Sequence, residues 1–111
     1  MTTALIDTTI FIELQNSAGA DFVAELVDTF EQDLPLMLAE MRAAQQDKST
    51  ERFRRAAHSI KSNASIFGAT QLASMARALE LGNLITDLAP IDALDAEQRR
   101  VVAALKELSR G

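Results

Sequence analysis

Apolar residues recur every three or four positions along most of this 111-residue chain, and this spacing constrains its fold more than any other feature. A period near 3.6 places such residues on one face of an α-helix, whereas a half-buried strand alternates them at every second position. The stripes are Phe22, Leu26, Phe30, Leu34, Met37, Leu38 and Met41; Phe53, Ala56, Ala57, Ile60, Ala64 and Phe67; Leu72, Met75, Ala76 and Leu79, extended by Leu84 or Ile85; and Leu94, Val101, Val102, Leu105 and Leu108. Each stripe predicts one amphipathic helix.

The breaks between stripes carry residues that begin or end helices. Asp21 is a candidate N-cap for the first long helix, and Ser49 or Thr50 for the second. Pro35 lies inside the first stripe, which continues in phase, so we expect this helix to be bent rather than ended. Gly68 can adopt the left-handed conformation that closes a helix.

The two ends of the chain are less regular. Asp92 or Asp95 is the candidate N-cap of the last helix. Residues 7–16 include β-branched side chains that favour a strand. Because a single strand would have no partner in a chain that is otherwise helical, we expect a short helix there. The connections are short, so consecutive helices should run antiparallel. The sequence therefore predicts one all-α domain over residues 1–111, an up-down four-helix bundle with a short additional N-terminal helix.

Composition excludes several classes of function. The chain has no cysteine, so it has no disulfide, thiolate metal site or cysteine nucleophile. No apolar run approaches the roughly 20 residues that span a bilayer, and the N-terminus lacks the pattern of a signal peptide. The net charge of −5 argues against binding to nucleic acid or to an anionic membrane. We therefore expect a cytoplasmic protein without membrane insertion. We also expect it to be a monomer.

His58, the single histidine, lies within a basic stretch of this acidic chain. It is two positions after Ala56, about 200° around the helix, and therefore points away from the core stripe. Its neighbours three and four positions away are Arg54, Arg55, Lys61 and Ser62, and Ser65 lies one turn further. An unperturbed imidazole is largely neutral at pH 7 and can act as a nucleophile, and cations one turn away can neutralise a phosphoryl group placed on it.

Other interpretations of His58 compete with this one. An exposed histidine on an amphipathic helix often has no role. A metal site is weakly supported, because the chain has one histidine, no cysteine, and no carboxylate one turn from His58. A serine-protease-like triad has no support, since a serine on a helix is not a nucleophile elbow.

The residues around His58 resemble a known family. They read Ala56-Ala57-His58-Ser59-Ile60-Lys61-Ser62-Asn63-Ala64-Ser65-Ile66-Phe67-Gly68-Ala69, followed by Leu72 and by Leu79-Glu80. This pattern is similar to that of the histidine-containing phosphotransfer (HPt) domain, and the order of helices extends the likeness across nearly the whole chain. Ser62 departs from the family, which usually has Gly there, and Ile60 and Asn63 replace commoner residues.

The resemblance implies roles for the matching residues. His58 would be phosphorylated on Nε2, and Lys61 would stabilise the phosphoryl group. Glu80 would bond Nδ1 and fix the tautomer that leaves Nε2 free. Ser62 would provide the small side chain that an approaching partner requires. From charge, size and position, further candidates for partner docking or for the phosphoryl environment are Ser65, Ile66, Arg54, Arg55 and Arg77.

The family likeness also implies a function. The chain would be a phosphorelay intermediate that takes a phosphoryl group from a receiver-domain aspartyl phosphate or a histidine kinase and passes it to a response-regulator receiver. The receiver would supply the metal and the acidic pocket, so we expect no cofactor or metal here, and no kinase or hydrolase activity of the chain itself. Two alternatives stay open: an unphosphorylated four-helix adaptor, and the phosphoacceptor domain of a larger kinase.

Overall fold

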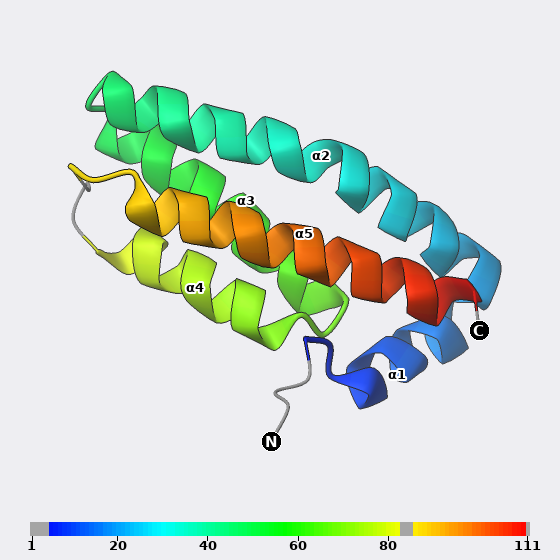
Figure 1. Ribbon diagram of the computed structural model, residues 1–111. Coiled ribbons are helices and arrows are strands. Elements are labelled where there is room, and N and C mark those ends of the chain that lie inside the picture. The colour runs from blue at the N-terminus through cyan, green and yellow to red at the C-terminus, as the bar shows by residue number, and fades with distance from the viewer. Residues whose placement is uncertain (1–4, 83–85, 111) are drawn as a thin grey trace.

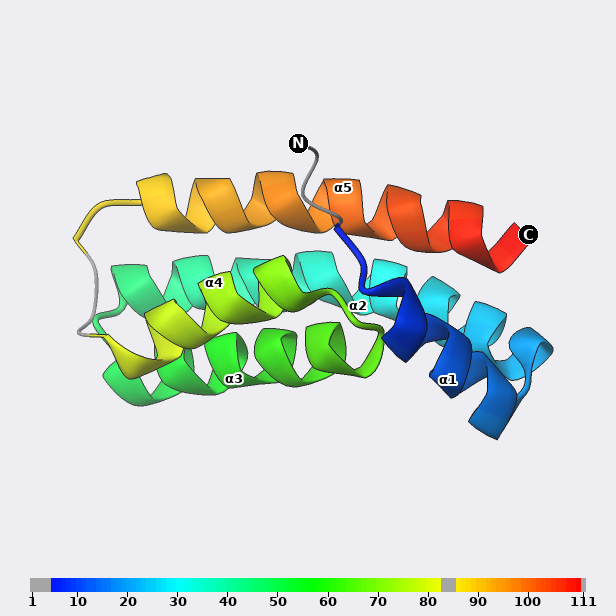
Figure 2. The ribbon, with the colours of Figure 1, turned by 90° about the horizontal axis from the view of Figure 1, so that it is seen from below.

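The computed structural model describes residues 5–82 and 86–110 of the chain. These residues form five α-helices and no strand: α1 (Thr8–Ala18), α2 (Ala20–Gln46), α3 (Thr50–Ile66), α4 (Thr70–Leu81) and α5 (Ala89–Arg110). Helices α2 to α5 run in alternating directions as a four-helix bundle, and α1 lies across one end of it (Figure 1 and Figure 2). The predicted all-α fold, a four-helix bundle with a short additional N-terminal helix, is confirmed. The expected extension of the third stripe to Leu84 or Ile85 lies outside the described residues.

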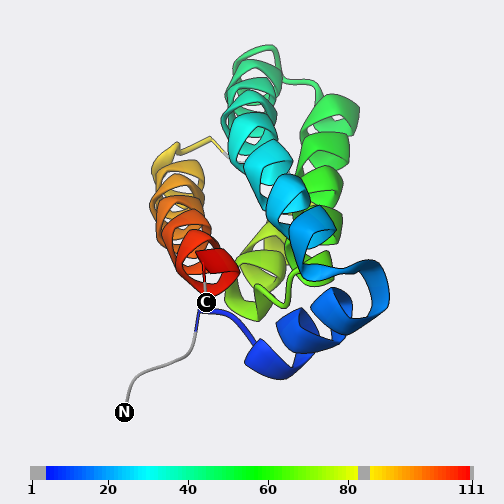
Figure 3. The same ribbon diagram turned by 90° about the vertical axis from the view of Figure 1, so that its right-hand side faces the viewer.

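The bundle is closed around one apolar core. Helix α3 packs against α2 and α4, and α5 packs against the same two helices, as the view along the bundle shows (Figure 3). The largest fully buried side chains come from every helix and include Phe11, Leu34, Met41, Phe53, Ile60, Leu72, Ile91, Leu94 and Leu105. The rings of Phe30 and Phe67 join α2 to the end of α3, with centroids 5.0 Å apart. None of the described helices is both long and apolar enough to cross a membrane.

The start of α2 differs from the prediction. Phe22 is 52% exposed, whereas Val23 and Val27 are buried. The predicted stripe runs from Phe22 to Leu34 in three steps of four residues. Each such step overshoots a full helical turn by about 40°, so Phe22, the first residue, lies off the core face. The steps of four, three and four from Val23 stay on that face. Asp21 is not the N-cap, because α2 begins at Ala20 directly after Gly19.

The starts of α3 and α5 test two predictions about N-caps. The Ser49 hydroxyl accepts a hydrogen bond from the backbone N–H of Arg52, so Ser49 caps α3 as expected. Helix α5 begins at Ala89, so Asp92 and Asp95 lie inside it and the prediction that one of them is its cap is wrong. The side chain of Asp87 instead accepts a hydrogen bond from the Ala89 N–H. Helix α2 continues through Pro35, as predicted.

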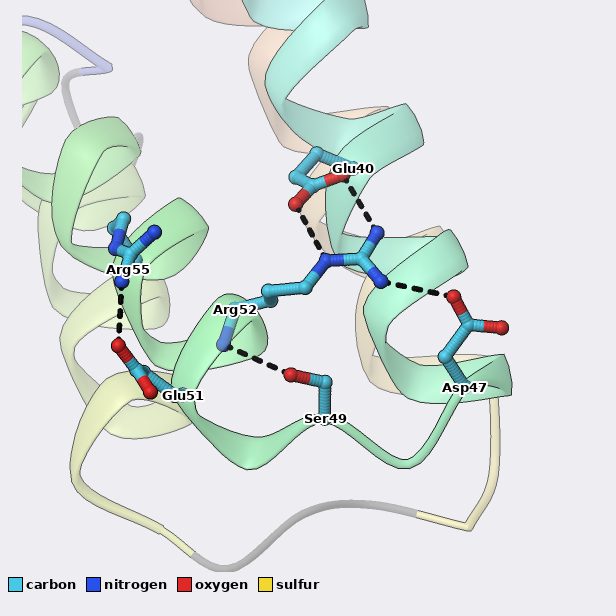
Figure 4. A network of polar contacts seen from close by, with 6 residues as sticks. All are labelled: Glu40, Asp47, Ser49, Glu51, Arg52 and Arg55. Atoms are coloured by element: carbon cyan, nitrogen blue, oxygen red, sulfur yellow. Dashed lines mark hydrogen bonds and ion pairs between the residues drawn. The ribbon is translucent and has the colours of Figure 1, made fainter.

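A polar network fixes the connection between α2 and α3 (Figure 4). The Arg52 guanidinium contacts both oxygens of Glu40, at 3.0 Å each, and Oδ2 of Asp47 at 2.8 Å. These bidentate contacts are the geometry that arginine and carboxylate groups favour. The network and the Ser49 cap together set where α3 begins, and hence which of its residues face outward.

Candidate functional site

His58 lies in the middle of α3 on its outward face. The side chain is 56% exposed, while Ala57 and Ile60 on the same helix are completely buried. The packing of these two residues fixes the rotation of α3, as the sequence predicts. Helix α4 runs antiparallel beside α3 and brings Glu80 next to the ring, so that Glu80 Oε2 lies 2.7 Å from His58 Nδ1.

Glu80 uses its two oxygens for two different partners. Oε2 contacts His58, and Oε1 lies 3.1 Å from Nζ of Lys61, which is one turn after His58 on α3. The pKa of the Glu80 carboxyl group is below its ordinary value. The Lys61 ammonium group lowers it most, and the His58 ring lowers it further. The carboxyl group is therefore ionised at neutral pH.

The charge of Glu80 decides the tautomer of the His58 ring. An ionised carboxylate has no proton to donate and can only accept. The ring nitrogen 2.7 Å away, Nδ1, must therefore carry the hydrogen of this bond. In a neutral imidazole the lone pair is then on Nε2. The contact thus prepares Nε2 as a nucleophile or proton acceptor.

The two arginines nearest to His58 along α3 have partners elsewhere. Nη2 of Arg54 donates to the backbone carbonyl of Gly82 at the end of α4, at 3.2 Å. Nη2 of Arg55 lies 2.6 Å from Oε1 of Glu51, as Figure 4 shows. In this structure Arg54 therefore joins α3 to the end of α4, and Arg55 forms an ion pair along α3.

The remaining predicted docking residues differ in their setting. Ser62 and Ser65 are exposed, and Ile66 is 49% exposed. Ser65 lies with Lys61 and Arg77 around a pocket between α3 and α4, which adjoins the His58 site. The structure therefore brings His58, Lys61, Glu80, Ser65 and Arg77 into one region.

The sequence analysis missed three features of this region. It predicted that Lys61 contacts a phosphoryl group and that Glu80 contacts His58, but it did not predict the contact between Lys61 and Glu80. The two residues are 19 positions apart on different helices, so no local sequence pattern indicates the pair. It also missed Thr70 and Ser74, which line the pocket with Arg77. Their steps of four and three along α4 place the three residues on one helix face, and that spacing could have identified them.

No group of three or more metal-ligating side chains occurs within residues 5–82 and 86–110. The polar groups at the site are one imidazole, one carboxylate, two cations and hydroxyls. This set suits the handling of a negatively charged group next to a nucleophilic nitrogen.

The comparisons with known proteins agree with this chemistry. The family model described as "Hpt domain" matches residues 25–109, so the chain belongs to the Hpt domain family and functions in phosphorelay histidine phosphotransfer. As a member of this family it interacts with two-component kinases and receiver domains. The structure is similar to the crystal structure of histidine-containing phosphotransfer protein B from Pseudomonas aeruginosa PAO1, with a TM-score of 0.75 and 28% sequence identity. The likeness covers 98% of this chain and 94% of that one. A search of curated protein sequences finds no match.

Proposed function

We propose that His58 is the residue of this chain that carries the phosphoryl group, on Nε2. The observation that supports this most directly is the 2.7 Å contact between His58 Nδ1 and Glu80. It leaves the lone pair on Nε2 of an exposed ring, and His58 is the single histidine of the sequence. The motif and the geometry therefore point to the same atom.

The transfer step uses the Glu80 carboxylate as well as the ring. The Nε2 lone pair attacks the phosphorus of a receiver's aspartyl phosphate, the N–P bond forms, and the P–O bond to aspartate breaks to release its carboxylate. As Nε2 donates its electron pair, positive charge develops on the ring, and the Nδ1–H bond to Glu80 becomes stronger. A fixed charge placed where charge develops lowers the barrier. Transfer to the next receiver reverses these steps.

Lys61 and Ser62 serve the partner side of this reaction. Lys61 is held by Glu80 within one turn of His58, from where its ammonium group can contact a phosphoryl oxygen. Ser62 lies one turn from His58 and is exposed, so its small side chain allows a receiver to approach the ring. Arg54, Arg55, Ser65, Ile66 and Arg77 extend this surface.

We further infer that residues 1–111 act as one unit, a cytoplasmic monomer that relays phosphoryl groups without kinase or hydrolase activity of its own. The structural likeness over 98% of the chain supports the single unit. The small site supports the lack of independent catalysis, because phosphoryl transfer needs positioning and charge stabilisation that the receiver completes.

A labelling experiment tests the assignment. The wild-type chain is incubated with radiolabelled phospho-receiver and, separately, with the small phosphodonor phosphoramidate. We expect acid-labile, base-stable label on the wild type and none on His58→Gln, with unchanged circular dichroism because the side chain is exposed. Label that persists on His58→Gln would contradict the assignment. Stable receiver binding without transfer by the wild type would favour the adaptor alternative.

A further inference from the structure

A pocket of about 340 Å³ lies beside the His58 site, between α1, α3 and α4. Lys61 belongs both to this pocket and to the site, so the two are continuous. The other polar side chains that line it are Ser65, Thr70, Ser74 and Arg77. Ile10 and Ala73 line it as well, and most of the lining surface is apolar. Every polar lining side chain is thus a cation or a hydroxyl group, and none is a carboxylate.

Arg77 is the cation of this pocket that has no partner. Lys61 is paired with Glu80, whereas no hydrogen bond or ion pair joins the Arg77 side chain to any residue in the part of the chain that the structure describes. Each of the other seven arginines has such a contact there: Arg42, Arg52, Arg54, Arg55, Arg99, Arg100 and Arg110. In a chain with net charge −5, the side chain of this one arginine remains exposed and unpaired in the pocket that adjoins the His58 site.

The chemistry of the pocket selects its occupant. A guanidinium group matches a carboxylate through two parallel N–H···O contacts, and nearby hydroxyls can donate further hydrogen bonds. The apolar part accepts the short methylene chain of a glutamate or aspartate. Because the pocket adjoins the proposed phosphorylation site, a protein that docks over His58 also covers it.

We propose that this pocket receives an acidic side chain of the docking receiver domain, and that Arg77 thereby contributes to the choice of partner. This inference rests on the proposed function, since it takes the receiver to dock over His58. Arg77 is then a specificity-determining residue that acts on the partner protein, separately from the phosphoryl chemistry at Nε2. A receiver with an apolar or basic side chain at this place would leave Arg77 desolvated and unpaired, which disfavours that complex.

The test measures receiver binding in the His58→Gln background, where the outcome is independent of any phosphoryl chemistry. The probe is a receiver domain that exchanges phosphoryl groups with the wild-type chain, with its dissociation constant measured at low and high ionic strength. Arg77→Glu is expected to weaken binding about tenfold at low ionic strength, with a smaller loss at high ionic strength. The matched control is Lys48→Glu, which makes the same change of charge at the turn between α2 and α3. The Lys48 side chain also has no polar partner among the described residues, and we expect its replacement to leave affinity within about twofold.

Three results would overturn this inference while leaving His58 as the phosphoacceptor. One is equal receiver affinity for Arg77→Glu and Lys48→Glu. The other concerns the chain without a receiver, labelled by phosphoramidate: if Arg77→Gln loses its label faster than the wild type, Arg77 serves the phosphoryl group itself. Competition of free inorganic phosphate with the receiver in an Arg77-dependent manner would likewise show that the pocket binds a small anion instead of a side chain.

Discussion

Glu80 Oε2 lies 2.7 Å from His58 Nδ1, although the two residues are 22 positions apart and lie on different helices. The contact exists because α3 and α4 pack side by side in opposite directions, joined by a turn at Gly68 that the start of α1 covers. The same carboxylate contacts Lys61, so one acidic side chain orients the ring and holds the cation. The tautomer of the His58 ring therefore depends on the packing of two helices rather than on α3 alone.

Removing the Glu80 carboxylate should release the ring proton from Nδ1. In Glu80→Ala we expect the ring to populate both tautomers at neutral pH and phosphorylation by receiver to slow about 10- to 100-fold, the range for outer groups that orient histidine ligands in metal sites. Nitrogen NMR of the imidazole gives the tautomer directly. Glu80→Gln keeps an acceptor for Nδ1–H and should retain more of the Nδ1–H form than Glu80→Ala. A wild-type ring with its proton on Nε2 would refute this role.

Lys61→Ala should slow phosphoryl transfer by about tenfold, since it would remove the proposed charge-assisted contact to the incoming phosphoryl group. Circular dichroism should show little loss of helix, because the side chain lies at the surface edge of α3. Lys106→Ala is the control: it breaks a similar pair, with Glu31 at 3.0 Å, on α5. Equal transfer rates for Lys61→Ala and Lys106→Ala would show that Lys61 acts only as a surface cation.

The sequence was sufficient to predict the bundle and the outward position of His58, because both follow from the 3.6-residue period of the apolar residues. It placed Phe22 wrongly because a four-residue step is almost in phase with the helix over one turn and out of phase over three. The partners of Lys61 and Arg54 could not be predicted from the sequence. These partners, the Glu80 carboxylate and the Gly82 carbonyl group, come within reach only because α4 packs against α3. The unpaired state of Arg77 depends on the same packing.

Ser62 should act through its size alone. Its side chain is exposed, and no hydrogen bond to it occurs among the described residues. Ser62→Ala should therefore leave transfer nearly unchanged, whereas Ser62→Arg should block the approach of a receiver one turn from the ring. The melting temperature of both variants should stay close to that of the wild type. Loss of transfer in Ser62→Ala would mean that the hydroxyl takes part in the reaction, and full activity of Ser62→Arg would mean that the receiver docks elsewhere.

The Glu40–Arg52 pair should make stability depend on pH in the acid range. The hydrogen bond from Arg52 holds the pKa of Glu40 below its ordinary value of 4.5 in the folded chain. A carboxyl group whose pKa is lower when folded stabilises the fold above its unfolded-state pKa, and this contribution is lost as the pH falls through the folded-state pKa. The contribution should be complete at neutral pH and decline below about pH 4.5.

Thermal unfolding at neutral pH and in acid tests this dependence. Glu40→Gln should lower the melting temperature at neutral pH and reduce the further drop on acidification. Glu13→Gln is the control, because the Glu13 side chain is exposed and has no polar partner among the described residues. The same acid-induced drop in Glu40→Gln and in the wild type would show that the pair in Figure 4 contributes nothing measurable.

The ends of α2 and α3 allow a paired test of backbone conformation. Both close in the same way, with hydrogen bonds from Ser49 N to Ala44 O and from Ala69 N to Ala64 O. The residue in the left-handed conformation is Lys48 (φ 56°) in the first case and Gly68 (φ 79°) in the second. Glycine adopts this conformation without steric cost, whereas a side chain is strained there.

Substitutions at these two turns should therefore change stability in opposite directions. Lys48→Gly should raise the free energy of unfolding by about 1 kcal/mol because it relieves that strain. Gly68→Ala should lower it by about 1–3 kcal/mol. Its added Cβ would lie 2.7 Å from the carbonyl oxygen of Asp7 and 3.0 Å from Cβ of Ile10. The start of α1 would therefore have to move, and this cost adds to the backbone strain of alanine at a positive φ. Denaturant unfolding of the two variants measures both effects. If Gly68→Ala leaves the free energy of unfolding unchanged, α1 is not held against this turn. Ile10 on α1 would then not form a fixed wall of the pocket beside the His58 site.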